Sequence, residues 1–106
     1  MIQVALDLRE QHRSKLDREF AEFHRANPHV YRRLADMARQ AVQAGRRKVG
    51  IGMLFEVLRW EHAISTVGDE FKLNNNHRSR YARLLMRLEP DLAGLFDVRE
   101  LADGED

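Results

Sequence analysis

The 106-residue chain contains no cysteine and only two prolines. Without cysteine there is no disulfide, no thiolate nucleophile and no zinc site that depends on sulfur, so we expect a reducing, intracellular setting. Long hydrophobic runs are also lacking, because the longest strongly apolar stretch, residues 49–55, is far shorter than the roughly 20 residues that cross a bilayer. Charged residues interrupt the first ten positions, so we expect neither export nor a membrane partner.

The charge is nearly balanced in total but unevenly distributed. Eighteen Lys and Arg against 17 Asp and Glu give a formal net charge of +1. Residues 1–90 contain 17 bases and 11 acids, whereas residues 91–106 contain one base and six acids. The length suits one hydrophobic core. We therefore predict a single globular domain over residues 1–101, basic in character, followed by a flexible acidic tail over residues 102–106.

Apolar periodicity predicts four helices. The expected ranges are residues 11–26, residues 28–44, a third helix that begins near residue 52, and residues 76–89. Asn27 and Pro28 indicate a helix start, with Asn27 as the N-cap and Pro28 at the first helical position. Gly45 stands where a left-handed residue ends a helix. Residues 90–94 are expected to form a turn or a short helical piece.

Three short strands are expected between and after these helices. They are residues 49–52, as a brief strand or an extended lead-in, residues 70–73, and an edge strand over residues 95–101. The fold class is therefore mainly α (α+β), and the order of elements resembles a winged-helix domain with a two- or three-stranded sheet. About ten residues separate Ser65 from Asn76, more than a helix-turn-helix usually has. The domain would thus be a variant of that fold or another small α+β fold.

The third helix is apolar on two opposite faces. Ile51, Leu54, Phe55 and Leu58 share one arc, and a second stripe consists of Met53, Val57, Trp60 and Ile64. A helix with two apolar faces is sandwiched inside the fold or is covered by a partner chain. The second stripe is therefore a candidate interface, for a homodimer or for a host protein. Packing beneath the wing strands is the alternative that we favour.

A stripe of basic residues on the fourth helix indicates nucleic-acid binding. It comprises Asn76, Arg80, Arg83 and Arg87, with Arg78 beside them, and a second basic segment consists of Arg46, Arg47 and Lys48. Arginine forms bidentate hydrogen bonds with guanine or phosphate, and asparagine pairs with adenine. A solvated helix face, or a basic patch that docks an acidic protein or the chain's own tail, would carry the same charges.

An enzyme is not expected. Glu70 and Lys72 could belong to a magnesium-dependent nuclease of the restriction-enzyme type, but no preceding strand supplies a second acid. The five histidines show no zinc-binding spacing, and neither a P-loop nor a dinucleotide fingerprint is present. We therefore predict no catalytic residue, no metal and no cofactor.

Several segments resemble a family of small proteins encoded by bacteriophages and prophages. These segments are residues 23–31 (FHRANPHVY), 53–61 (MLFEVLRWE), 71–76 (FKLNNN), 80–84 (RYARL) and 90–94 (PDLAG). The resemblance spans most of residues 18–101. It implies expression in the cytoplasm of a bacterial host and a regulatory, accessory or host-directed role, and it assigns no functional residues.

The sequence thus predicts a non-catalytic, winged-helix-like protein whose partner is double-stranded DNA. The alternative is a protein-protein interaction module that engages a host or phage protein.

Overall fold

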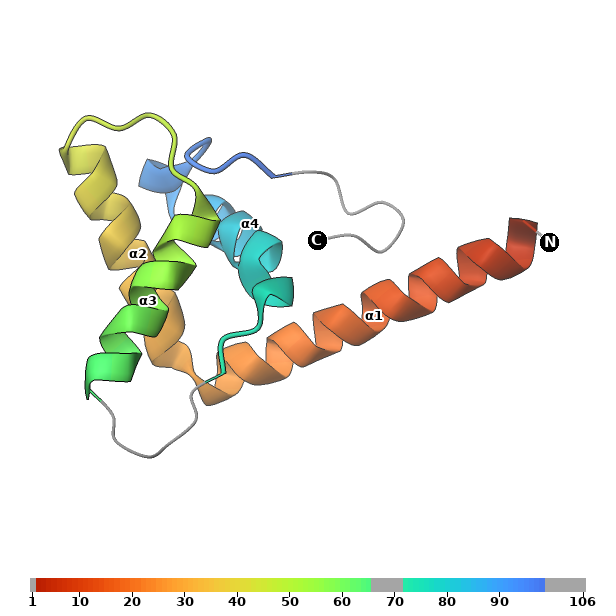
Figure 1. Cartoon of the computed structure of the whole chain (residues 1–106). Coiled ribbons are helices and arrows are strands. Elements are labelled where there is room, and N and C mark those ends of the chain that lie inside the picture. The colour runs from red at the N-terminus through yellow and green to blue at the C-terminus, as the bar shows by residue number, and fades with distance from the viewer. Residues whose placement is uncertain (1, 66–71, 99–106) are drawn as a thin grey trace.

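The computed structural model describes residues 2–65 and 72–98. Within them lie four α-helices and two short 3-10 helices: α1 (Ile2–Ala26), α2 (Pro28–Gln43), α3 (Ile51–Ser65), η1 (Asn75–His77), α4 (Arg78–Leu88) and η2 (Pro90–Leu92). Helices α2, α3 and α4 pack together, and α1 projects from one corner of this body (Figure 1). The mainly helical class is therefore confirmed.

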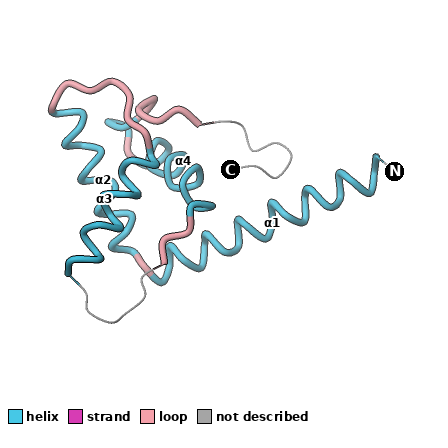
Figure 2. Tube along the Cα trace, viewed as in Figure 1, coloured by secondary structure: helices cyan, strands magenta, loops and turns pink. Residues whose placement is uncertain are grey.

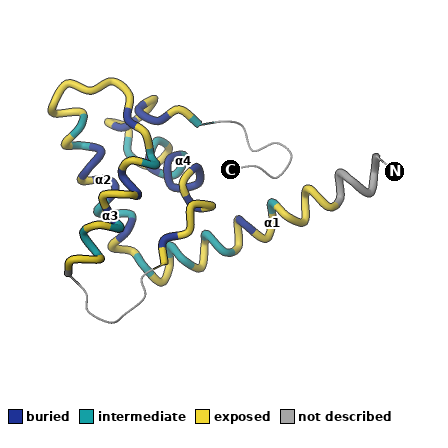
Figure 3. The backbone as a smooth tube through the Cα atoms, in the orientation of Figure 1, coloured by how far each residue is buried: buried dark blue, intermediate teal, exposed yellow. Residues whose placement is uncertain are grey.

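Helix α1 is longer than its apolar pattern predicts. It starts at Ile2 instead of residue 11. No glycine or proline precedes Pro28, and most of residues 2–26 are good helix formers, so nothing in the sequence ends the helix earlier. Leu8 is 59% exposed, whereas Leu16 is buried. Figure 3 shows the change from exposed to buried residues along the helix. The periodic pattern indicated only the half of α1 that contacts the body.

The prediction that Asn27 occupies the N-cap position of α2 is confirmed, but the expected side-chain cap is not formed. Its side chain makes no capping hydrogen bond, and its Nδ2 instead donates to the carbonyl of Phe23 at 3.0 Å. The backbone N–H of Asn27 donates to the same carbonyl at 2.9 Å. Asn27 therefore closes the end of α1, while Pro28 begins α2 as predicted.

Helix α2 ends as the sequence predicts. Gly45 has a φ of +90°, and its N–H donates to the carbonyl of Val42 at 3.0 Å. The N–H of Arg46 donates to the carbonyl of Ala41 at 3.0 Å. These two hydrogen bonds form a Schellman motif, which satisfies carbonyls that the helix leaves free and turns the chain toward α3.

One hydrophobic core joins the helices. Its fully buried side chains include Leu34 of α2, Phe55 of α3, and Tyr81 and Leu85 of α4. Aromatic contacts attach α1 to this core. The ring of Phe20 meets that of Tyr81 edge-on at a centroid distance of 4.7 Å. Such pairs add stability beyond the area they bury. The C-terminal half of α1 is thereby fixed against α4.

The expected strands are not observed in the described segments, and Figure 2 shows helices and loops alone there. Of the strand predicted over residues 49–52, only Val49 and Gly50 lie outside a helix, because α3 already begins at Ile51. Leu95 and Phe96, which are consecutive, are both buried, so this segment lacks the alternation of a strand. A hydrogen bond from Val49 N–H to the carbonyl of Leu95, at 3.0 Å, joins the two segments.

The remaining predictions fall partly on residues that the structure does not describe. Residues 70 and 71, residues 99–101 and the predicted tail over residues 102–106 lie outside the described part of the chain. The small sheet and the winged-helix assignment therefore stay predictions.

Candidate functional site

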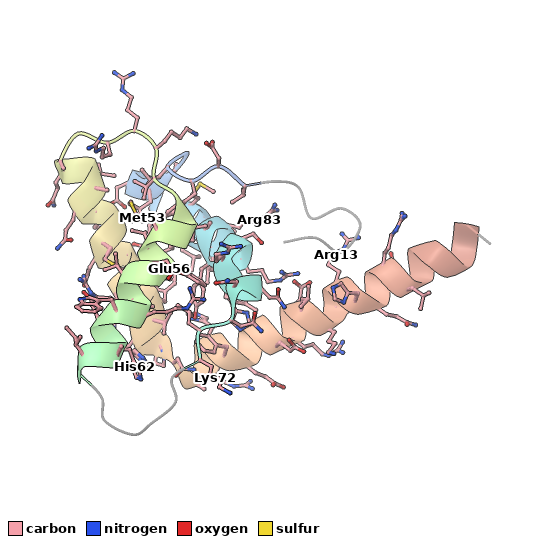
Figure 4. The ribbon with its side chains drawn as sticks, in the orientation of Figure 1. Arg13, Met53, Glu56, His62, Lys72 and Arg83 are labelled. Carbon is pink, nitrogen blue, oxygen red and sulfur yellow. The ribbon has the colours of Figure 1, made fainter. Side chains whose placement is uncertain are left out.

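The second apolar stripe of α3 is exposed to solvent. Trp60 is 65% exposed, Ile64 64%, Met53 59% and Val57 39%. The expectation that this stripe packs inside the fold was wrong, because the described residues do not cover it. Met53 marks its start in Figure 4. The stripe therefore stays available to a partner.

The opposite face of α3 holds the helix in place. Leu54, Phe55 and Leu58 are buried against the core. An ion pair adds to this, since Arg33 of α2 donates from Nε and Nη2 to the two carboxylate oxygens of Glu61, at 2.9 and 2.5 Å. The hydrogen bonds from Arg33 hold the pKa of Glu61 below its ordinary value of 4.5. The exposed stripe thus lies on a helix whose opposite face is packed against the core.

A groove of about 600 Å³ runs beside the stripe, between α2 and α3. Met53 and Val57 line it together with Met37 and Ala41 of α2. Its described lining contains the cations Arg33, Arg46 and Lys48 and no acid.

Residues of the predicted basic segment and of the predicted apolar stripe therefore line the same groove. Arg46, Arg47 and Lys48 are all exposed, and Arg46 and Lys48 line the groove. Lys48 donates from Nζ to Asp97 Oδ1 at 2.9 Å, across a pair whose side chains are 59% and 84% exposed. Exposed pairs of this kind contribute about 0–1 kcal/mol, so a partner can replace Asp97 at low cost.

The basic stripe of α4 is only partly exposed. The side chain of Arg80 is 4% exposed, and its Nε donates to Asp17 Oδ1 of α1 at 2.8 Å. Its Nη1 donates to the carbonyl of Asn76 at 3.3 Å. Arg83 is half-buried, whereas Asn76 and Arg87 are exposed. Arg80 is thus a structural ion-pair residue and does not offer its guanidinium to DNA.

Arg80, Arg83 and Arg87 line a pocket of about 290 Å³ that α1 completes with Asp17 and Phe20. Figure 4 shows Arg83 on α4. Arg78 is exposed and does not line this pocket. Its side chain lies beside Gly52 of α3, where a Cβ on Gly52 would be 3.3 Å from Arg78 Nη1. The eight predicted DNA-binding residues are therefore divided between separate surfaces: Arg46 and Lys48 belong to the α2–α3 groove, and three arginines of α4 belong to the pocket beside α1.

Sequence reasoning missed the role of Arg59. Its Nη2 donates to the carbonyl of Leu73 at 2.6 Å and also to Asn75 Oδ1, and it pairs with Glu56. Arg59 therefore fixes the segment that leads into η1. No local pattern indicated this role, since the partners are 14 and 16 residues away.

The enzyme alternative gains no site. Lys72 is exposed, and Glu70 lies outside the described residues. Among the residues described, no group of three or more His, Asp or Glu side chains could hold a metal ion. The described helices are also too short or too polar to cross a membrane.

No protein-family model matches the chain, and neither a curated protein nor a solved structure shows significant similarity to it. Function therefore has to be inferred from the surfaces described above.

Proposed function

We propose that this protein is a protein-interaction module that binds its partner through α3. The observation that carries the proposal is the exposed stripe of Met53, Val57, Trp60 and Ile64 on a helix whose other face is buried in the core. Tryptophan and methionine are enriched at protein interfaces, and tryptophan at binding hot spots above all. Four exposed apolar side chains along one face of a helix are more than the scattered exposure of a typical surface.

The groove indicates the chemistry of the partner. Most of the residues that line it are apolar, and the charged side chains in its described lining are all cationic. An amphipathic helix that places apolar side chains on the stripe and acidic side chains toward Arg46 and Lys48 matches this surface. We therefore infer that the partner presents an acidic amphipathic helix.

Peptide display gives a direct test. A library of helical peptides is selected for binding to the wild-type protein. The affinity of each recovered peptide is then measured from the change in fluorescence of Trp60, the single tryptophan of the chain. We expect peptides with apolar residues at helical spacing and an excess of Asp and Glu. Trp60→Ala should weaken their binding by about 30-fold or more in a competition assay, as for a hot spot worth about 2 kcal/mol.

Two matched variants serve as controls. Leu88 of α4 is 53% exposed, so Leu88→Ala removes a comparable apolar side chain away from the stripe and should leave binding unchanged. Arg46→Glu should weaken binding, whereas Arg25→Glu on α1 should not. Peptides that bind Trp60→Ala as well as wild type would refute the proposal. A wild-type dimer that Trp60→Ala dissociates in analytical ultracentrifugation would show that the occupant is a second copy, contrary to the acidic helix.

As a second function we propose DNA binding, as the sequence predicts, by a winged-helix-like protein. The side chains of Arg46, Arg47, Arg78 and Arg87 are exposed and make no hydrogen bond or ion pair with described residues. Such free cations can bind phosphate groups, and their binding would weaken strongly as salt rises. Arg80 is left out because it already pairs with Asp17.

Fluorescence anisotropy with duplex DNA at about 50 mM salt tests this second function. Arg87→Gln and Arg47→Gln should each lower the salt slope by about one. Arg25→Gln should do so only if binding is spread over the whole surface, which would contradict a defined DNA site. Absence of binding at low salt would overturn the proposal.

A further inference from the structure

The pocket between α1 and α4 concentrates positive charge in a concave place. Arg80, Arg83 and Arg87 line it from α4, and Asp17 is the one acid in its described lining. Phe20 and Leu84 form apolar walls. Asp17 is itself engaged, because its Oδ1 accepts from Arg80 Nε at 2.8 Å. The pocket therefore holds more guanidinium groups than carboxylates.

Arg83 has an unusual environment within this pocket. Its Nε and Nη2 are buried, and no described residue accepts a hydrogen bond from them. Buried polar groups nearly always have a partner, and a buried cation without an acceptor is costly. An acceptor that reaches Arg83 through the pocket it lines would remove this cost.

The geometry points to an oxyanion, a phosphate or carboxylate group, as that partner; this inference is independent of the α3 interface. Arginine presents a planar fork of donors that matches such oxygens, and Arg87 beside Arg83 is exposed and can supply further donors. Phe20 and Leu84 would contact the apolar part of the ligand. At about 290 Å³ the pocket suits a small ligand or a single anionic group.

Nuclear magnetic resonance of the ¹⁵N-labelled full chain tests this site. The protein is titrated with sodium phosphate and, separately, with sodium acetate, at an ionic strength held constant with chloride. We expect the Nε–H signal of Arg83, assigned by its loss in Arg83→Lys, to shift saturably. The signal of Arg33, whose Nε already donates to Glu61, should stay in place.

Arg87→Gln keeps the experiment decisive if Arg83→Lys does not fold. Because Arg87 is exposed, its substitution should leave the fold intact and weaken anion binding about tenfold, the effect of losing one charge-assisted hydrogen bond. Arg25→Gln should have no effect. Saturation by phosphate alone identifies a phosphate site, and saturation by acetate identifies a carboxylate site.

Shifts that do not saturate with either anion, or that are the same in Arg87→Gln, would overturn the inference. The peptide-binding test at α3 reports on a different surface, so failure of one proposal leaves the other standing.

Discussion

Arg80 and Arg87 both belong to the basic stripe that the sequence predicts on the fourth helix, seven residues apart, yet their surroundings differ. The Arg80 side chain is 4% exposed and bonded to Asp17, whereas Arg87 is exposed. We expect Arg80→Ala to lower the free energy of unfolding by about 2 kcal/mol, because Asp17 and the carbonyl of Asn76 lose a charged donor. Arg87→Ala should change it by less than about 0.5 kcal/mol. Urea denaturation measures both values, and equal losses would contradict a stabilising role for the hydrogen bonds of Arg80.

Gly45 provides a second prediction at the residue scale. Its φ of +90° is unfavourable for a residue with a Cβ, whereas Gly50 has no positive φ and open space around it. We expect Gly45→Ala to destabilise the protein by about 1 kcal/mol. Gly50→Ala is the matched control and should cost less. A thermal or urea unfolding series that ranks the two substitutions in the reverse order would refute the role of Gly45 in ending α2.

At the scale of an element, α3 has two apolar faces with different roles. Phe55 is fully buried, while Trp60 is 65% exposed. Phe55→Ala should therefore lower the free energy of unfolding by about 3–5 kcal/mol. Trp60→Ala should change it by no more than about 0.5 kcal/mol. Circular dichroism during urea unfolding distinguishes the two, and a large loss with Trp60→Ala would mean that the stripe stabilises the folded chain itself.

Helix α1 shows the same division along its length. Its C-terminal half carries Phe20 and Phe23, which pack against the hydrophobic core, together with the buried Leu16, whereas Leu8 near the other end is exposed. An aromatic contact between Phe20 and Tyr81 of α4 holds this half in place. Helix α1 therefore both adds to the core and forms one wall of the pocket between α1 and α4.

At the scale of the whole molecule, a polar network joins α2 to η2. Tyr31 donates to Glu89 Oε2 at 2.7 Å, and Arg39 bonds both Glu89 and Asp91. The hydrogen bond from Tyr31 and then that from Arg39 lower the pKa of Glu89, and the bond from Arg39 lowers the pKa of Asp91. Burial, with Glu89 nearby, raises the pKa of Tyr31 to about 12.

These lowered pKa values predict a dependence of stability on pH. A carboxyl group whose pKa is lower in the folded state stabilises it above the unfolded pKa, here 4.5 for Glu89 and 3.8 for Asp91, and this contribution is lost as pH falls through the folded pKa. We expect the difference in unfolding free energy between wild type and Arg39→Gln to be largest above about pH 5 and to shrink toward pH 3. Urea denaturation at a series of pH values measures it, with Arg25→Gln as a control whose difference stays constant. A difference that grows in acid would contradict the network.

By itself, the sequence determined the helices from Pro28 onward, the glycine that ends α2 and the two apolar faces of α3. Each of these depends on periodicity or on local backbone geometry, which neighbouring residues dictate. Tertiary structure decided the rest. Whether Arg80 meets solvent or Asp17 is decided by packing over 63 residues of sequence, and whether Trp60 is covered depends on what the rest of the chain places over it. Helical spacing puts a side chain on a face, but only the fold puts that face inside or outside.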